Sequence, residues 1–200
     1  MEPRAEVYSR EVTESVVRHP PITVEQYLDL EEASLVRHEY VAGVMHAFAG
    51  TSKRHNRIAG NILRILSAAA AGGPCRVYMS DVKLRAAADV YYYPDLMVGC
   101  GAEGEDPFVE DAPCLVVEIT SPSTAVIDRR EKLVAHKRIP TLEAYVIVEQ
   151  DERRVQRHWR DQQGVWWEAE VSGAGRVPIP CPEVTLTLDE IYGGLDPSGG

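Results

Sequence analysis

The sequence lacks several features that would fix its class at once. It has only four cysteines, Cys75, Cys100, Cys114 and Cys181, which form no CxxC motif and no paired Cys/His spacing. This pattern argues against a structural zinc site and predicts reduced thiols, as in a cytoplasmic protein. The first twenty residues are charged throughout and contain no apolar core, so we expect no signal peptide. No run approaches the roughly eighteen apolar residues that a membrane span needs.

The chain also lacks an excess of positive charge, with a formal net charge of −10 at pH 7. Proteins that bind nucleic acid nonspecifically usually carry a basic surface. Two segments are nevertheless locally basic: 51–64 contains no acidic residue, and 128–138 carries five basic residues against two acidic ones. Each segment could line a nucleic-acid groove or form a solvated helix face, and the sequence leaves both interpretations open.

Hydrophobic periodicity predicts a mixed α/β (α+β) fold. Helices are expected at 23–34, 54–70 and 128–139, strands at 75–80, 82–86, 91–99, 114–120 and 144–150, hairpins at 38–50 and 153–171, and a closing segment at 184–192. The polar stretch 102–113 predicts a surface loop. The order helix, three-strand meander, helix, strand indicates a central mixed sheet flanked by helices. The length suits one domain, placed at 22–193, with flexible segments at 1–21 and 194–200.

Two carboxylates interrupt strands that otherwise look buried. The run 91–99 contains Pro94 and Asp95, and the strand 114–120 carries Glu118 near its end. A carboxylate in a buried sheet is costly unless it is paired. If the two strands are neighbours, both acids converge at one end of the sheet, where hard oxygen ligands suit Mg²⁺ or Mn²⁺. The alternative is that each acid pairs with a nearby arginine or lysine.

A lysine on the following helix fits the same interpretation. The helix 128–139 could return Lys132 toward the end of the Glu118 strand, where its ammonium would stabilise developing charge on a phosphate. The alternative for Lys132 is a solvent-exposed i,i+4 pair with Asp128, which contributes little.

Together these residues resemble a known family. The segments HEYVAGVMHAFAGTSKRHNRIAGNILRIL, YYYPDLMV, LVVEITSPST with DRREKLVAHKRIPTLEAYVIVEQ, and VTLTLDEIY are similar to the Uma2 family, formerly DUF820. The resemblance covers about residues 22–193, and the ordered set of Asp95, Glu118, SPST and Lys132 is far more specific than the PD pair alone. Uma2 proteins are predicted endonucleases of the PD-(D/E)xK superfamily. The resemblance therefore implies a restriction-endonuclease-like core, preceded here by an extra helix and hairpin.

The resemblance also implies roles for individual residues. Asp95 and Glu118 match the two motif carboxylates, which bind a metal ion together with the backbone carbonyl of the next residue, here Ile119. The motif lysine should stand two positions after Glu118, but this chain has Thr120 there. In Uma2 proteins the lysine comes from the following helix, and Lys132 occupies that place.

Two further positions match the Uma2 pattern. Glu39 stands where the family shows an acidic residue, which implies a further, water-mediated metal contact; alternatively it pairs with Arg37 or Arg57. His55 opens the helix before the strands, where it could contact a phosphate or transfer a proton. Its alternative role is to cap that helix.

The expected function is that of an endonuclease that hydrolyses DNA with Mg²⁺ or Mn²⁺ as cofactor. We expect the protein to be cytoplasmic and not membrane-bound. By analogy with restriction enzymes, we also expect a homodimer. The main alternative is a binding or regulatory protein that keeps the nuclease fold without useful catalysis, since the charge is acidic and the in-strand lysine is missing. A third possibility, hydrolysis by a carboxylate pair without metal as in glycosidases, has no sugar-binding aromatic pattern to support it.

Overall fold

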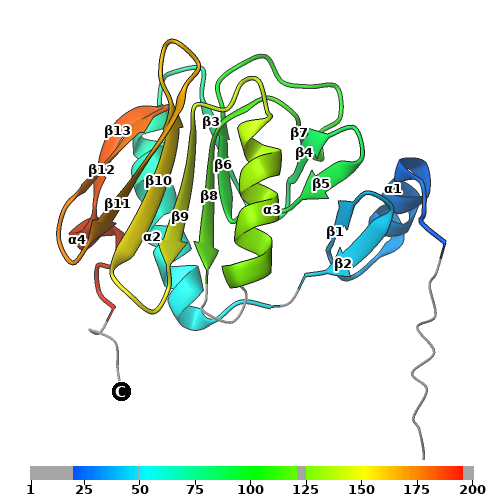
Figure 1. The fold of residues 1–200 in the computed structure, drawn as a ribbon, viewed down its shortest axis with the longest axis horizontal. Coiled ribbons are helices and arrows are strands. Elements are labelled where there is room, and N and C mark those ends of the chain that lie inside the picture. The colour runs from blue at the N-terminus through cyan, green and yellow to red at the C-terminus, as the bar shows by residue number, and fades with distance from the viewer. Residues whose placement is uncertain (1–19, 49, 121–124, 196–200) are drawn as a thin grey trace, which may run out of the picture.

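The computed structural model describes residues 20–48, 50–120 and 125–195, except for the side chains of 125–130. Its largest sheet has six strands in the order β11-β10-β9-β8-β6-β3 (Figure 1). The strands are β3 (Arg76–Met79), β6 (Leu96–Gly99), β8 (Pro113–Thr120), β9 (Ala144–Glu149), β10 (Arg154–Arg160) and β11 (Trp166–Ser172). The neighbours β8 and β9 run parallel and are connected through helix α3 (Ala125–Lys137), whereas the other neighbours in this sheet are antiparallel.

A second sheet of five strands, in the order β2-β1-β5-β4-β7, lies beside the first (Figure 1). Its strands are β1 (His38–Val41), β2 (Val44–Ala47), β4 (Lys83–Ala87), β5 (Val90–Tyr92) and β7 (Val109–Glu110). Helix α1 (Val24–Ala33) packs on this sheet through buried Tyr27, whose ring stacks on Tyr40 at 4.8 Å and tilts against Tyr91 at 5.5 Å. An aromatic cluster therefore fixes the N-terminal helix and hairpin to the rest of the chain.

Helices cover the two faces of the six-stranded sheet (Figure 1). One face of β8, with Leu115 and Val117, packs in one core cluster with Ile62 of helix α2 (Lys53–Ala70). The opposite face, with Val116, packs in a second cluster with Leu133 of α3. Because β8 and β9 are buried on both faces, their sequences are nearly continuous hydrophobic runs rather than alternating ones.

A small C-terminal hairpin completes the core on the α2 side. Strands β12 (Arg176–Pro180) and β13 (Glu183–Thr187) pair with each other and lead into helix α4 (Leu188–Ile191). Thr187 caps α4 and forms a capping box with Glu190, which is why the predicted segment 184–192 divides into a strand and a helix. The sequence analysis did not predict β12, which contains two prolines and little alternation.

Most predicted elements, the mixed α+β class and the N-terminal helix and hairpin are confirmed, but two predictions are wrong. The run 91–99 is not one strand: β5 and β6 belong to different sheets, and Tyr93–Asp95 carry the chain between them. Pro94 ends β5 because it has no N–H for a ladder. The predicted three-strand meander is therefore split, since β3 lies in the larger sheet and β4 in the smaller. The predicted loop 102–113 contains β7, which pairs in parallel with β4.

Within the described residues, no helix is long and apolar enough to cross a membrane. The predicted flexible segment 1–21 lies outside these residues except for its last two positions, and the predicted tail 194–200 except for its first two. The domain limits at 22 and 193 remain a prediction.

The structure does not show the reduced thiols that the cysteine spacing predicts. All four sulfur atoms lie together, and the structure pairs them in two disulfides, Cys75–Cys100 and Cys114–Cys181. The sequence hides this arrangement because the four positions are spread over more than a hundred residues. Antiparallel pairing of β3 with β6 and of β6 with β8 brings three of these positions to one end of the sheet.

Helix α3 buries His136 completely between the rings of Tyr92 and Tyr145, at centroid distances of 5.3 and 4.7 Å. Neither ring nitrogen of His136 has a hydrogen-bond partner among the described residues. Burial, reinforced by the nearby charge of Lys132, lowers the pKa of His136 from 6.5 to about 3. The histidine is therefore neutral in the folded protein over the whole ordinary pH range.

We predict that His136→Phe removes part of the acid sensitivity of the fold. The unfolded chain binds a proton at His136 below about pH 6.5 and the folded chain does not, so this residue lowers the free energy of unfolding as the pH falls from 6.5 toward 3. Thermal unfolding at pH 7.5 and pH 5 should show a smaller loss of Tm in the variant than in the wild type. Tyr145→Phe, a change in the same aromatic cluster, should keep the wild-type loss. Equal losses in all three proteins would contradict the prediction.

Candidate metal centre

Asp95 lies in the short connection between β5 and β6 and is 5 % exposed. Its Oδ2 accepts the backbone N–H of Ile119 at 2.7 Å and lies 3.1 Å from Nε2 of His55. Strand β6 begins only at Leu96, so it offers no backbone partner to the amide of Ile119 on β8. The carboxylate of Asp95 accepts the hydrogen bond of that amide instead. Among the described residues, the other oxygen, Oδ1, receives no hydrogen bond.

Glu118 approaches Asp95 because their strands are neighbours. In the antiparallel pairing of β6 with β8, Leu96 stands opposite Val117, so Asp95 lies one position beyond, opposite Glu118. Glu118 is 8 % exposed and shares with Val116 the face that α3 covers. The two carboxylates therefore converge at one end of the sheet, as the sequence predicts if the strands are adjacent.

The carbonyl of Ile119 points toward the same place. Along a strand, the N–H and C=O of one residue leave on the same side. Because the N–H of Ile119 reaches Asp95, its carbonyl also leaves β8 on the side of Asp95, beyond the end of β6. Three oxygen-bearing groups, the two carboxylates and this carbonyl, thus lie at the same edge of the sheet.

Lys132 reaches the site from α3. Its Nζ donates to Oε1 of Glu39 at 2.7 Å and lies 3.4 Å from Oε1 of Glu118, with the ring of Tyr92 at 5.2 Å. The ammonium thus stands between two carboxylates of different elements. The alternative partner, Asp128, has a side chain outside the described residues.

Glu39 extends from β1 and has neither of the partners that the sequence offered as alternatives. Arg37 instead lies 3.7 Å from Asp81, and Arg57 donates to the carbonyl of Gly194. Glu39 therefore belongs to the site through its 2.7 Å ion pair with Lys132.

His55 does not cap its helix. The N-cap is Ser52, whose hydroxyl accepts the backbone N–H of His55 at 3.0 Å, which leaves the imidazole free to face Asp95. Thr120, at the motif's lysine position, donates to Glu149 at 3.3 Å on the neighbouring strand. The structure therefore brings together Asp95, Glu118, Ile119, Lys132, Glu39 and His55.

Two positioning residues were missed by the sequence analysis. The hydroxyl of Tyr93 donates to buried Glu31 at 2.9 Å, and its backbone N–H donates to Glu39 at 3.4 Å. Glu31 also accepts both the backbone N–H and the ring nitrogen of His38. These bonds fix the connection that carries Asp95. No sequence signal marked Glu31, which stands among other acidic residues near the end of an amphipathic helix.

Burial raises the pKa of Glu118 from 4.5 to about 8, and the negative charges of Asp95 and Glu39 add to the shift, while Lys132 opposes it. A raised pKa and an ion pair with Lys132 appear contradictory for one carboxyl group. The distances resolve this, because the ammonium lies closer to Glu39 than to Glu118. Without a cation at the site, the raised pKa favours the protonated form of Glu118 at neutral pH.

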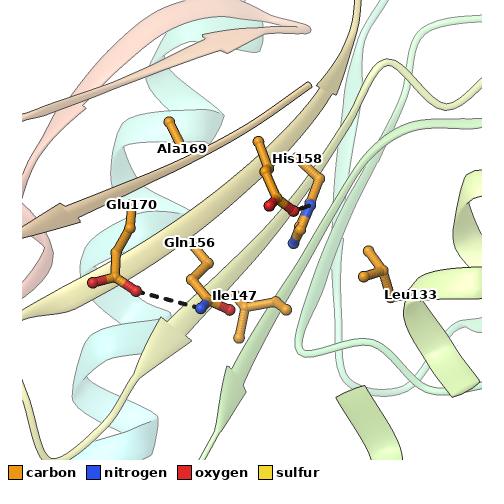
Figure 2. A pocket seen from close by; sticks show the side chains of 7 residues that line it. Leu133, Ile147, Gln156, His158, Ala169 and Glu170 are labelled. Atoms are coloured by element: carbon orange, nitrogen blue, oxygen red, sulfur yellow. Dashed lines mark hydrogen bonds and ion pairs between the residues drawn. The ribbon is translucent and has the colours of Figure 1, made fainter. Parts of the chain in front are cut away.

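A hollow of about 440 Å³ lies beside the site on the α3 face of the sheet (Figure 2). It is lined by Leu133, Ile147, Gln156, His158, Glu168, Ala169 and Glu170. Ile147 pairs in register with Glu118 across β8 and β9, so the hollow begins one strand away from the carboxylates. The wall farthest from the carboxylate site carries Glu168 and Glu170, whose negative charge disfavours binding of a phosphate backbone there. Because of its position and its charge, we treat the hollow as separate from the carboxylate site.

We predict that Glu118→Gln changes how stability depends on pH when EDTA keeps metal ions away. The folded state retains the Glu118 proton between about pH 4.5 and 8 and the unfolded state loses it, so the wild type loses stability as the pH rises through this window. Each pKa unit corresponds to about 1.4 kcal/mol. Urea unfolding at pH 5.5 and 8 should therefore show a wild-type decline that the variant lacks. Parallel declines in the two proteins would refute the assignment of the proton to Glu118.

Comparisons with known proteins identify the family of this chain. The family Uma2, described as "Putative restriction endonuclease", matches residues 24–189. The uncharacterized protein slr1290 of Synechocystis sp. (strain ATCC 27184 / PCC 6803 / Kazusa) is 30% identical over 179 residues, which cover 88% of this chain and 94% of that protein. The uncharacterized protein sll1609 of the same strain is 29% identical over 159 residues, covering 76% and 88% of the two chains.

A solved structure shares the fold. It is the crystal structure of "a putative nuclease belonging to DUF820" from Anabaena variabilis ATCC 29413, with a TM-score of 0.71, 17% identity, and coverage of 86% of this chain and 98% of that one. The α+β architecture described above is thus also the architecture of that protein. With its match spanning nearly the whole described chain, this protein belongs to the Uma2 family.

Proposed function

We propose that this protein is a Mg²⁺-dependent endodeoxyribonuclease that hydrolyses phosphodiester bonds of DNA. The observation that carries the proposal is the convergence of Asp95 and Glu118 at adjacent strand ends, with Lys132 within 3.4 Å of Glu118. Membership of a family described as restriction endonucleases supports the same reaction class. Fold alone does not fix function, so the argument rests on the site.

The donors at the site fit a hard divalent cation. Asp95, Glu118 and the carbonyl of Ile119 offer oxygen atoms only, which suits Mg²⁺ or Mn²⁺, whereas Zn²⁺ in such a site favours nitrogen or sulfur. The raised pKa of Glu118 results mainly from its burial, which disfavours the ionised carboxylate. A bound Mg²⁺ would favour the ionised form, polarise a phosphate and lower the pKa of a water molecule.

The remaining residues orient and neutralise the reacting groups. The amide of Ile119 and the ring of His55 hold the Asp95 carboxylate from two directions, which fixes the position of a ligand oxygen. Lys132 would place an ammonium beside the scissile phosphate and stabilise the charge that develops there. Glu39 positions Lys132 through the 2.7 Å bond and is not required as a metal ligand in this arrangement.

The start of α2 would provide the approach for DNA despite the acidic net charge. Lys53 and Arg57 are exposed in the same helical turns that carry His55 to the site. Contacts from these side chains to phosphates would be local and salt-sensitive. Cutting both strands of a duplex requires two such sites, so a homodimer belongs to this proposal, as does a cytoplasmic location with access to DNA.

The alternative function is a nuclease-fold protein that binds a partner without useful catalysis. Thr120 at the motif's lysine position favours it, because the catalytic ammonium must then come from another element. The geometry of Lys132 weakens this alternative, since the lysine of α3 does reach Glu118.

The first test is nicking of supercoiled plasmid DNA with Mg²⁺ or Mn²⁺. We expect the wild type to be active. Asp95→Asn and Glu118→Gln should lower the cleavage rate about 100-fold or more, because each removes a ligand to the cation. Lys132→Met should lower the cleavage rate about 100-fold, because it removes the ammonium. EDTA should abolish cleavage. The matched control is Glu110→Gln, which changes another buried carboxylate, one whose Oε1 accepts the N–H of Ala112. Equal cleavage by wild type and Asp95→Asn would identify a contaminant and favour the binding alternative.

A second experiment separates the two roles considered for Glu39. If Glu39 positions Lys132, Glu39→Gln should lower kcat about tenfold, since it weakens a hydrogen bond to a charged group, and leave Mn²⁺ affinity within about threefold of wild type. Calorimetric titration with Mn²⁺ and plasmid kinetics measure the two quantities. A large loss of Mn²⁺ affinity with little change in kcat at saturating metal would instead make Glu39 a contributor to metal binding.

A further inference from the structure

The four cysteines come from four separate segments and meet at one end of the six-stranded sheet. Cys75 precedes β3 and Cys100 follows β6, and because Arg76 pairs with Gly99 these two cysteines stand opposite each other. Cys114 is the second residue of β8, beside the end of β6. Cys181 lies in the two-residue turn between β12 and β13.

Their sulfur atoms form one cluster rather than two separate pairs. The Sγ of Cys100 is bonded to that of Cys75, yet it also lies 3.0 Å from the Sγ of Cys181 and 3.5 Å from that of Cys114. The ligand atoms of Cys75, Cys100 and Cys181 all lie within 4.8 Å of one another. A disulfide needs only its own two sulfur atoms, so two disulfides do not have to lie next to each other. Four thiolates that bind one metal ion do have to lie together.

We propose that the reduced cysteines form a tetrathiolate site for a single Zn²⁺ ion. With Zn–S bonds of about 2.3 Å, tetrahedral geometry places the sulfur atoms about 3.8 Å apart. The Sγ of Cys100 lies 3.0 and 3.5 Å from those of Cys181 and Cys114, which is shorter than this value, so the sulfur atoms would have to move apart slightly once the disulfides are reduced. Four cysteines without any other ligand are a closed set, which is the pattern of structural rather than catalytic zinc.

The two states differ by a balanced reaction. Two equivalents of a dithiol reductant give four electrons and four protons to the Cys75–Cys100 and Cys114–Cys181 disulfides, and are themselves oxidised to two disulfides. The four thiols formed then lose four protons as Zn²⁺ binds, because thiolates are the ligands. The oxidised pair of disulfides and the zinc-bound tetrathiolate are therefore alternative states of one cluster.

The surroundings fit an anionic metal site with a structural role. A Zn²⁺ ion with four thiolates carries a net charge of −2, and Arg76, which also pairs with Glu103 at 3.0 Å, adjoins Cys75. Its guanidinium donates to the carbonyls of Pro74 and Gly101, which flank Cys75 and Cys100 in sequence. Cys114 and Cys181 are buried in the main core cluster, which excludes water from one side. Such an ion would tie the C-terminal hairpin to three strands of the sheet.

This site is independent of the proposed nuclease centre. Cys114 and Glu118 are four residues apart on β8, which corresponds to roughly 13 Å along an extended strand. The two sites also differ in chemistry, since one offers only sulfur and the other only oxygen. Failure of one proposal therefore does not imply failure of the other.

The test uses the full-length Asp95→Asn/Glu118→Gln protein, in which the carboxylate site is disabled. After reduction with a dithiol and removal of oxygen, we expect uptake of about one Zn²⁺ or Co²⁺ per chain. Co²⁺ should give thiolate charge-transfer absorption and the visible bands of a tetrahedral ion, and Zn²⁺ should displace it. The same protein kept oxidised should take up no metal with these bands.

Cys100→Ser and Cys181→Ser should each lose the Co²⁺ absorption or reduce the affinity at least about tenfold, because a ligand is removed. Far-UV circular dichroism checks that each variant folds. If Cys100→Ser or Cys181→Ser does not fold, Cys75→Ser, at the margin of the core, replaces it in the test. Reduced, folded protein that shows no thiolate–cobalt absorption would overturn the proposal. So would a Co²⁺ spectrum that is unchanged in all three cysteine variants.

Discussion

The arrangement of the site depends on one hydrogen bond, from the backbone N–H of Ile119 to the carboxylate of Asp95. Strand β8 extends beyond the start of β6, so its last amides on that side have no strand to pair with. Buried amides need a partner, and here a side chain provides it. Because Pro94 ends β5 and directs the chain into β6, Asp95 can reach across to β8. The same bond places this carboxylate opposite Glu118 and turns the Ile119 carbonyl toward both.

Burial and ion pairing act together on the carboxylates at this point. Among the described side chains, the ammonium of Lys132 lies 2.7 Å from Glu39 and 3.4 Å from Glu118, and His55 faces Asp95. Removing a carboxylate from water favours its protonation, and burial raises the pKa of Glu118 for this reason. A divalent ion would favour the ionised form of the same carboxyl group. The oxygen donors that two neighbouring strands bring to one edge of the sheet are therefore the physical argument for metal binding.

The sequence predicted those parts of the molecule that depend on local pattern. The helices around 54–70 and 128–139 and the strand 114–120 were found because their hydrophobic periodicity is strong and agrees with their burial. Asp95 and Glu118 were identified because carboxylates in buried strands are costly and therefore conspicuous, whereas Lys132 was identified from its place on the following helix and from the resemblance to the Uma2 family. The assignment of β5 and β6 to different sheets was missed, since hydrophobicity alone does not show which sheet a strand joins. Glu31 was missed for a similar reason: its burial depends on a distant tyrosine.

The cysteine cluster and the carboxylate cluster occupy opposite ends of the same two strands. Backbone hydrogen bonds between two strands end where one of the strands ends. Beyond that point, side chains connect one strand to the next. Near Glu118 the connection is made by carboxylates and an ammonium, and near Cys114 it is made by sulfur. Both ends hold β6 against β8, and the buried residues between them form a rigid spacer. A metal ion or a pair of disulfides at the sulfur end would restrict the sliding of β6 on β8. That restriction would keep Asp95 in register with Glu118 at the other end.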